Sequence, residues 1–128
     1  MLQIDLQSRV PIYEQLINSV IRLKSLGVLN SDEQLPSVRS LATELGVNPN
    51  TVQKAYQMLE SDGIIYSVTG KGSFISPDKS ATKAILDNAE KALKNAISSA
   101  YLMGISKERA AKLCEEVHKE TMERGAAK

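Results

Sequence analysis

A run of amide and lysine side chains near the middle of the chain carries its clearest chemical signal. At 100° per residue, one side of a helix through this run presents polar side chains and no carboxylate: Asn50, Gln53, Lys54 and Gln57, with Thr51 at the flank. Amide side chains can bind adenine bidentately in the major groove of duplex DNA, and lysine can reach guanine or phosphate. A solvated surface helix that merely lacks acids is the alternative. We interpret this face as a candidate DNA-reading surface.

The elements around this run predict a helix-turn-helix. A short helix with an apolar face is expected from about Ser37, and Gly46 is its natural stop. Asn48 followed by Pro49 then signals a new helix start, and this third helix is expected to end near Asp62. An earlier helix is expected from Pro11 to Gly27. Two helices joined by a tight glycine-containing turn are the sequence form of a helix-turn-helix.

A β-hairpin is expected directly after the third helix. Residues 64–68 and 73–75 favour strands, and the turn between them is Thr69-Gly70-Lys71-Gly72, in which two glycines flank Lys71. Glycine on both sides lets the backbone approach another surface closely and place one cation there. An ordinary β-turn has the same composition. The position after a recognition helix favours a wing, the hairpin that reaches the minor groove or the sugar-phosphate edge.

The composition indicates a small folded protein but does not by itself announce a nucleic-acid partner. The chain has 128 residues, 42% of them apolar and 24% charged, with a formal net charge of +1. Residues 1–78 carry six Lys/Arg and eight Asp/Glu, whereas residues 79–128 carry ten and seven. Any basic DNA-binding face must therefore be local. No apolar run suits a membrane span or secretory signal, and Cys114 can form no intrachain disulfide, so a cytoplasmic setting is expected.

Catalysis and cofactor binding find little support in the residue types. The single histidine, His118, follows the single cysteine, Cys114, by four residues, which places both on one face of a helix. Two ligands make no closed metal site, and no orienting partner is evident. No phosphate-cradling glycine loop is present. We therefore expect no enzyme activity, no metal site and no cofactor.

Several separate blocks of the sequence, in order and at matching spacing, resemble the GntR family of bacterial regulators. The resemblance covers roughly residues 10–76 and rests on these blocks: Pro11-Ile12-Tyr13-Glu14-Gln15-Leu16, Leu35-Pro36-Ser37-Val38-Arg39-Ser40-Leu41-Ala42, Leu45-Gly46-Val47-Asn48-Pro49-Asn50-Thr51-Val52, Ala55-Tyr56, Leu59-Glu60-Ser61-Asp62-Gly63 and Gly70-Lys71-Gly72-Ser73-Phe74-Ile75. The short tail resembles the YtrA-like subfamily.

This resemblance implies particular DNA contacts. It assigns Arg39 on the second helix to DNA, and it places the other contacts on the recognition helix and the wing: Asn48, Asn50, Thr51 and Gln53, then Thr69, Gly70 and Lys71. Many members carry arginine where this chain has Gln53, so the chain departs from the family's pattern at this contact position. The family also implies action as a repressor.

The last third of the chain is expected to form a dimerisation arm. The likeliest boundary lies at residues 76–80, giving a winged domain at 1–77 and an arm at 78–128. Two arm helices carry apolar stripes that neither can bury alone, and we predict these interface residues: Ile85, Ala89, Leu93, Ile97, Tyr101, Leu113 and Val117. Folding of both helices back on the winged domain is the alternative.

Taken together, the residues and the resemblance predict a mainly α protein with a small β-hairpin. We expect a winged helix-turn-helix that acts as a homodimeric repressor on a near-palindromic operator in double-stranded DNA. The alternative is a winged helix used for protein contacts without DNA binding, which the acidic balance of residues 1–78 favours. The sequence identifies no small-molecule effector.

Overall fold

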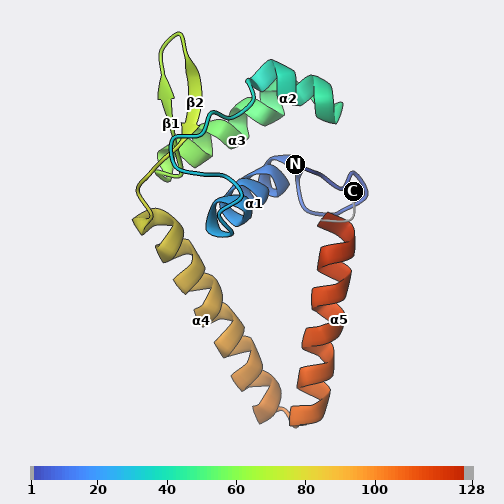
Figure 1. Cartoon of the computed structure of the whole chain (residues 1–128). Coiled ribbons are helices and arrows are strands. Elements are labelled where there is room, and N and C mark those ends of the chain that lie inside the picture. The colour runs from blue at the N-terminus through green and yellow to red at the C-terminus, as the bar shows by residue number, and fades with distance from the viewer. Residues whose placement is uncertain (1, 126–128) are drawn as a thin grey trace. The chain divides into compact units, whose positions relative to one another are not determined.

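Five helices and one antiparallel hairpin make up the computed structural model, which describes residues 2–125 (Figure 1). In chain order the elements are α1 (Ile12–Ser25), α2 (Val38–Leu45), α3 (Pro49–Ser61), β1 (Ile65–Val68), β2 (Gly72–Ile75), α4 (Ser80–Leu102) and α5 (Lys107–Gly125). The chain divides into two compact units, residues 1–82 and residues 83–128. The first unit is the winged helix-turn-helix predicted from the sequence.

The helix ends follow the local signals in the sequence. Ser37 is the N-cap of α2, and its hydroxyl accepts a hydrogen bond from the Ser40 amide at 3.1 Å. Gly46 ends α2 with φ of +70°, a left-handed conformation that glycine adopts without a Cβ penalty. Pro11 lies one position earlier than expected, at the N-cap of α1 rather than at the first helical residue. These caps keep the connection between α2 and α3 short.

The core of the winged unit gathers around α3. The side chains that are almost fully buried come from α1, α2, α3, β2 and the residue just before β1: Leu16, Val20, Leu41, Val52, Leu59, Ile64 and Ile75. Helix α3 contacts α1, α2 and β1, so it lies between the other helices and the hairpin. Its position is therefore set by aliphatic packing from three sides.

A short segment before α2 pairs with the hairpin, which the turn-like composition of residues 28–35 did not predict. The Leu35 amide donates to the Ser73 carbonyl at 2.8 Å, and the Ile75 amide donates to the Glu33 carbonyl at 2.9 Å. Gln34 forms an isolated bridge to Phe74. Residues 32–35 therefore lie along the free edge of β2 and are joined to it by backbone hydrogen bonds and this one bridge.

The winged unit extends into the first turn of α4. Lys24 Nζ donates to the Asp78 carbonyl at 2.9 Å, and burial lowers the pKa of Lys24 below its ordinary value. Thr82 is 6% exposed, so it packs within this unit. The compact unit thus reaches five residues beyond Pro77, where proline suggested the boundary.

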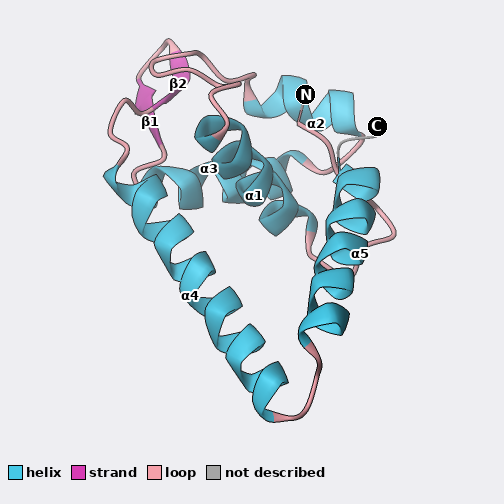
Figure 2. Cartoon of the chain, turned by 60° about the horizontal axis from the view of Figure 1, so that its bottom comes forward, coloured by secondary structure: helices cyan, strands magenta, loops and turns pink. Residues whose placement is uncertain are grey.

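The second unit consists of the rest of α4 and α5, joined by a short loop (Figure 2). Gly104 lies in this loop with φ of +101°, and the Ser106 hydroxyl accepts from the Arg109 amide at 3.0 Å, as expected for a cap of α5. No described side chain between Lys83 and Glu123 is buried. Within residues 2–125, no helix has the length and apolar character needed to cross a membrane.

Candidate DNA-binding interface

Helix α3 buries one side and exposes the amide-and-lysine side. Val52, Ala55, Tyr56 and Leu59 are buried, whereas the outward set is exposed: Asn50, Gln53, Lys54 and Gln57. Thr51 is half-buried at the flank. The surface predicted from the sequence is thus accessible in the chain.

Asn48 has a structural task at the start of this helix. Its Oδ1 accepts a hydrogen bond from the Asn50 amide at 2.8 Å, which satisfies one of the unpaired amides of the first turn. The side-chain oxygen is therefore committed to the cap, and only the amide NH₂ group remains for a contact outside the protein.

Tyr56 fixes α3 to the chain in front of α2. Its hydroxyl donates to the Pro36 carbonyl at 2.7 Å, and the residue is 5% exposed. Burial raises the pKa of Tyr56 to about 12, because the phenolate would lose its hydration inside the fold. The sequence marked Tyr56 only as a core residue, so this anchor is new.

The wing presents its predicted residues at the tip. Thr69, Gly70 and Lys71 are all exposed, and the Lys71 amide closes the turn on the Val68 carbonyl at 2.9 Å. Behind the tip, the rings of Tyr66 and Phe74 stack with centroids 5.5 Å apart. The hairpin is therefore braced by an aromatic pair at its base and left open at its tip.

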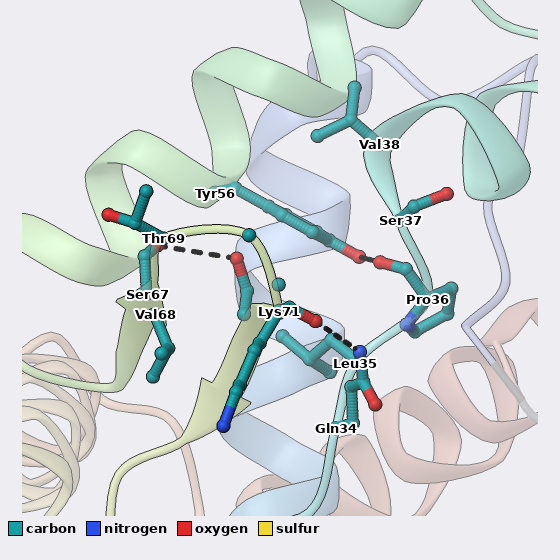
Figure 3. A pocket seen from close by; sticks show the side chains of 13 residues that line it. Gln34, Leu35, Pro36, Ser37, Val38, Tyr56, Ser67, Val68, Thr69 and Lys71 are labelled. Atoms are coloured by element: carbon teal, nitrogen blue, oxygen red, sulfur yellow. Dashed lines mark hydrogen bonds between the residues drawn. The ribbon is translucent and has the colours of Figure 1, made fainter.

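A groove of about 430 Å³ separates the wing from the two helices (Figure 3). Ser37, Val38 and Tyr56 line it from the α2 and α3 side, residues 67–73 line it from the hairpin, and residues 34–36 connect the two sides. The structure thus brings Thr69, Gly70 and Lys71 together with the start of α2. Arg39 lies one residue beyond this lining, and it is exposed.

Lys54 has a partner that the sequence did not suggest. Its Nζ lies 3.9 Å from the centroid of the Tyr13 ring, a cation–π contact between α3 and α1. The Tyr13 hydroxyl in turn donates to a Glu14 carboxylate oxygen at 3.4 Å. A carboxylate therefore lies near the Tyr13 side of the predicted surface, although α3 itself has no acid before Glu60.

The winged unit has more acids than bases, but few of its acids lie in the segments that form α2, α3 and the wing. Between Pro36 and Leu59 the single acid is Glu44, and residues 63–77 contain none. The same stretches carry Arg39, Lys54 and Lys71. The acids of this unit thus fall mainly on other segments, which leaves α2, α3 and the wing suited to a polyanion.

The arm residues predicted for an interface remain accessible in the single chain. Ile85, Ile97 and Leu113 are half-buried and Ala89 is exposed. Three larger side chains are exposed to a degree that is unusual for an apolar stripe: Leu93 at 57%, Tyr101 at 46% and Val117 at 58%. Cys114 and His118 are exposed as well, and no group of three or more potential metal ligands occurs among the described residues.

The fold and the exposed side of α3 define the chain as a winged helix-turn-helix protein. Comparison with known proteins gives its family. Residues 11–75 match the bacterial regulatory proteins of the gntR family. The chain is also 40% identical over 111 residues to the HTH-type transcriptional repressor YtrA of Bacillus subtilis, covering 85% of each chain. The chain belongs to the gntR family. Because 111 matched residues exceed the length of the winged unit, the likeness to YtrA extends into the arm.

Two solved structures support this assignment. A protein described as a transcriptional antiterminator from Listeria monocytogenes shares 37% identity and a TM-score of 0.72, covering 92% of this chain and 90% of that one. The DNA-binding domain of AraR in complex with operator ORX1 has 29% identity and a TM-score of 0.54, covering 59% of this chain and 96% of that one. The chain is thus a DNA-binding transcription regulator and not an enzyme.

Proposed function

We propose that the chain is a homodimeric repressor that binds a near-palindromic operator through α3 and the wing. The observation that carries this proposal is the exposed, carboxylate-free face of α3 with Asn50, Gln53, Lys54 and Gln57. Relatives of the chain support the direction of regulation, since YtrA is named a repressor. As a regulator of bacterial genes, the protein would work in the cytoplasm, where the chromosome lies.

The proposed contacts divide into base-reading and backbone-positioning groups. In this proposal the exposed amides of Asn50 and Gln53 bind base edges, with Thr51 beside them, and Lys54 and the Asn48 amide group bind phosphate or guanine. Arg39 on α2 and the wing residues Thr69, Gly70 and Lys71 contact the sugar-phosphate backbone or the minor groove in this proposal. These two groups would fix the register of the winged unit on the duplex.

In this proposal the arm pairs two chains, so that a second winged unit binds the other half of the operator. Leu93 and Val117 are each more than half exposed in a single chain, so a second copy of the arm would bury apolar surface that this chain leaves in water. A dimer would present two recognition helices to successive major grooves about 34 Å apart, which favours a near-palindrome. It would also double the number of phosphate contacts made by a weakly charged domain.

The experiment that tests the proposal begins with selection of bound fragments from genomic DNA of the source organism. Binding of the full chain to the selected duplex is then measured against salt. A true operator binder should lose affinity steeply as salt rises, because phosphate contacts release counterions. A protein-interaction module without DNA binding would select no duplex, which would refute the proposal.

Substitutions then test the assigned contacts. Arg39→Ala and Lys71→Ala should each weaken operator binding and lower the salt dependence by about one counterion per monomer, with unchanged unfolding temperature. Lys91→Ala is the matched control, since it removes one exposed cation from the opposite side of the arm stripe. Unchanged affinity in both Arg39→Ala and Lys71→Ala would remove these residues from the interface.

A further inference from the structure

The backbone pairing that supports the wing stops short of its tip. Along the outer edge of β2, the Ile75 amide donates to the Glu33 carbonyl and the Leu35 amide donates to the Ser73 carbonyl, at 2.9 and 2.8 Å. The next residue whose amide would face β2 is Ser37, and Ser37 is already the N-cap of α2, so the strand pairing ends here. The tip of the hairpin projects beyond this last rung.

A side chain takes over where the backbone pairing ends. Gln34 Nε2 donates a hydrogen bond to the Lys71 carbonyl at 2.7 Å, across 37 residues of sequence (Figure 3). A Cβ atom on residue 72 would lie 2.9 Å from the same nitrogen, which is closer than Cβ atoms approach other atoms in proteins. Glycine at position 72 therefore gives Gln34 room to reach the tip.

The same short loop also holds the recognition helix. Two residues after Gln34, the Pro36 carbonyl accepts the Tyr56 hydroxyl from α3 at 2.7 Å, and the next residue, Ser37, caps α2. Residues 34–37 thus touch the wing tip at one end and α2 and α3 at the other. In Figure 3 both hydrogen bonds lie along this loop, on either side of Leu35.

We propose that Gln34 is a positioning residue for the wing: its bond to the Lys71 carbonyl holds the tip at a fixed separation from α3, so that Lys71 and the recognition helix meet one duplex together. This inference rests on the proposed contact of Lys71 with DNA. Gln34 itself need not touch DNA. Its role is to add a connection at the tip itself, beyond the hairpin base and the pairing of residues 33–35 with β2.

The physical argument is one of conformational entropy. A two-stranded hairpin is marginally stable by itself, and the tip of this one has glycine on both sides of Lys71. An unanchored tip would have to be ordered when DNA binds, at a cost in affinity. A single exposed hydrogen bond that orders it beforehand is expected to raise affinity by about two- to tenfold.

A double-mutant cycle on the full chain tests this coupling, with the selected operator duplex as the ligand. The variants are Gln34→Ala, Lys71→Ala and the double variant, and Gln34→Glu removes the donor while keeping the size of the side chain. Gln7→Ala is the matched control, an exposed glutamine elsewhere in the winged unit. We expect Gln34→Ala to weaken binding about two- to tenfold in the parent chain and at most about twofold in Lys71→Ala.

A second measurement needs no DNA. Amide hydrogen exchange of the free protein should become faster at residues 71–73 in Gln34→Ala, while amides of α3 keep their protection. A merely structural role of Gln34 would instead change exchange throughout the winged unit, and that result would overturn the inference.

The binding outcomes separate this inference from the proposed function. If Gln34→Ala weakens binding equally with and without Lys71, Gln34 does not act through the wing tip and the inference fails. If Lys71→Ala weakens binding and Gln34→Ala does not, the inference fails while the proposed wing contact stands. If neither substitution matters, the wing contact and the inference fail together.

Discussion

At the scale of single residues, the proposed recognition face of α3 presents amides more than charge. Asn50, Gln53 and Gln57 are exposed with a single cation, Lys54, among them. Amides read base edges through paired donors and acceptors, and they contribute little to non-specific attraction for phosphate. We therefore expect the winged unit to discriminate between sequences more strongly than it binds DNA in general.

Gln53 is the residue that best tests whether the amides discriminate between base sequences. Replacing it with alanine should relax the preference at one base position of each half-site, since a good bidentate pair discriminates by about 1–3 kcal/mol. Selection of operators by the Gln53→Ala protein, followed by sequencing, measures the preference at every position. The Gln7→Ala protein should select the same operators as the parent. An unaltered base profile for Gln53→Ala would show that this side chain reads no base.

The contact between Lys54 and Tyr13 leads to a second residue-scale prediction. A ring beneath the ammonium group holds it at a defined place, at an energy of about 0.5–1 kcal/mol for an exposed pair. Tyr13→Leu should therefore lower operator affinity about two- to fivefold, whereas Tyr13→Phe, which keeps the ring, should bind as the parent does. Equal affinities of the leucine and phenylalanine proteins would contradict a role for the ring.

At the scale of elements, α3 is held by apolar packing on one side and by one buried hydroxyl. Tyr56 ties the helix to Pro36, and the same loop leads into α2 and pairs with β2. The recognition helix, the helix before it and the wing therefore share one connecting segment. A substitution in residues 34–37 should therefore alter the position of all three elements, although the segment is short.

Tyr56→Phe tests the anchor through stability. The substitution leaves the Pro36 carbonyl without its donor and should lower the free energy of unfolding by about 1–2 kcal/mol. Denaturant unfolding near pH 7 measures this difference. Little change would mean that water replaces the hydroxyl at no cost.

The pH dependence gives an independent check on the same residue. The pKa of Tyr56 is about 12 in the folded chain and about 10 when unfolded, so folding favours the neutral phenol. Its contribution is fully present below about pH 10 and is lost as pH rises to about 12, because the unfolded chain ionises first. The parent should thus lose more stability than Tyr56→Phe between these values, and parallel pH curves would contradict the buried phenol.

At the scale of the whole molecule, the chain consists of a packed unit and an arm with little buried surface of its own. The winged unit contains all of the buried side chains among the described residues, and it extends through Thr82. The arm from Lys83 onward leaves apolar side chains in water. Folding and dimerisation should therefore be separable by cutting the chain at this point.

A chain that ends at residue 82 should be folded and monomeric. Ending it at Pro77 instead removes the buried Thr82 and the start of α4, so the shorter chain should be less stable, although still folded. Sedimentation gives the mass of each species, and thermal unfolding compares their stabilities. A dimer formed by residues 1–82 would place the interface outside the arm.

A single substitution in the full chain tests the arm without truncation. Leu93→Glu puts a charge in the middle of the predicted stripe and should shift the protein towards monomer, with a parallel loss of operator affinity. Lys91→Glu is the matched control, because position 91 lies on the other side of the same helix. Dimers of equal strength in both proteins would refute the predicted stripe.

Local sequence signals predicted most of the elements and the face of α3. Gly46, Asn48 and Pro49 act through their own backbone preferences and hydrogen bonds to the next few residues, so they have the same effect in any helical context. The alternation of buried and exposed positions in α3 is likewise a property of consecutive residues. For this reason the helix-turn-helix, the hairpin and the exposed amides could all be predicted from the sequence.

Tertiary structure alone decided how these parts are held together. The bonds from Tyr56 to Pro36 and from Gln34 to Lys71 join residues 20 and 37 positions apart, and Lys54 meets Tyr13 from another helix. Such contacts depend on where the core places each backbone, and no spacing in the sequence encodes that distance. Gln34 in particular lies in a turn-like segment without periodicity, so its place beside the wing could only be seen once the chain was folded.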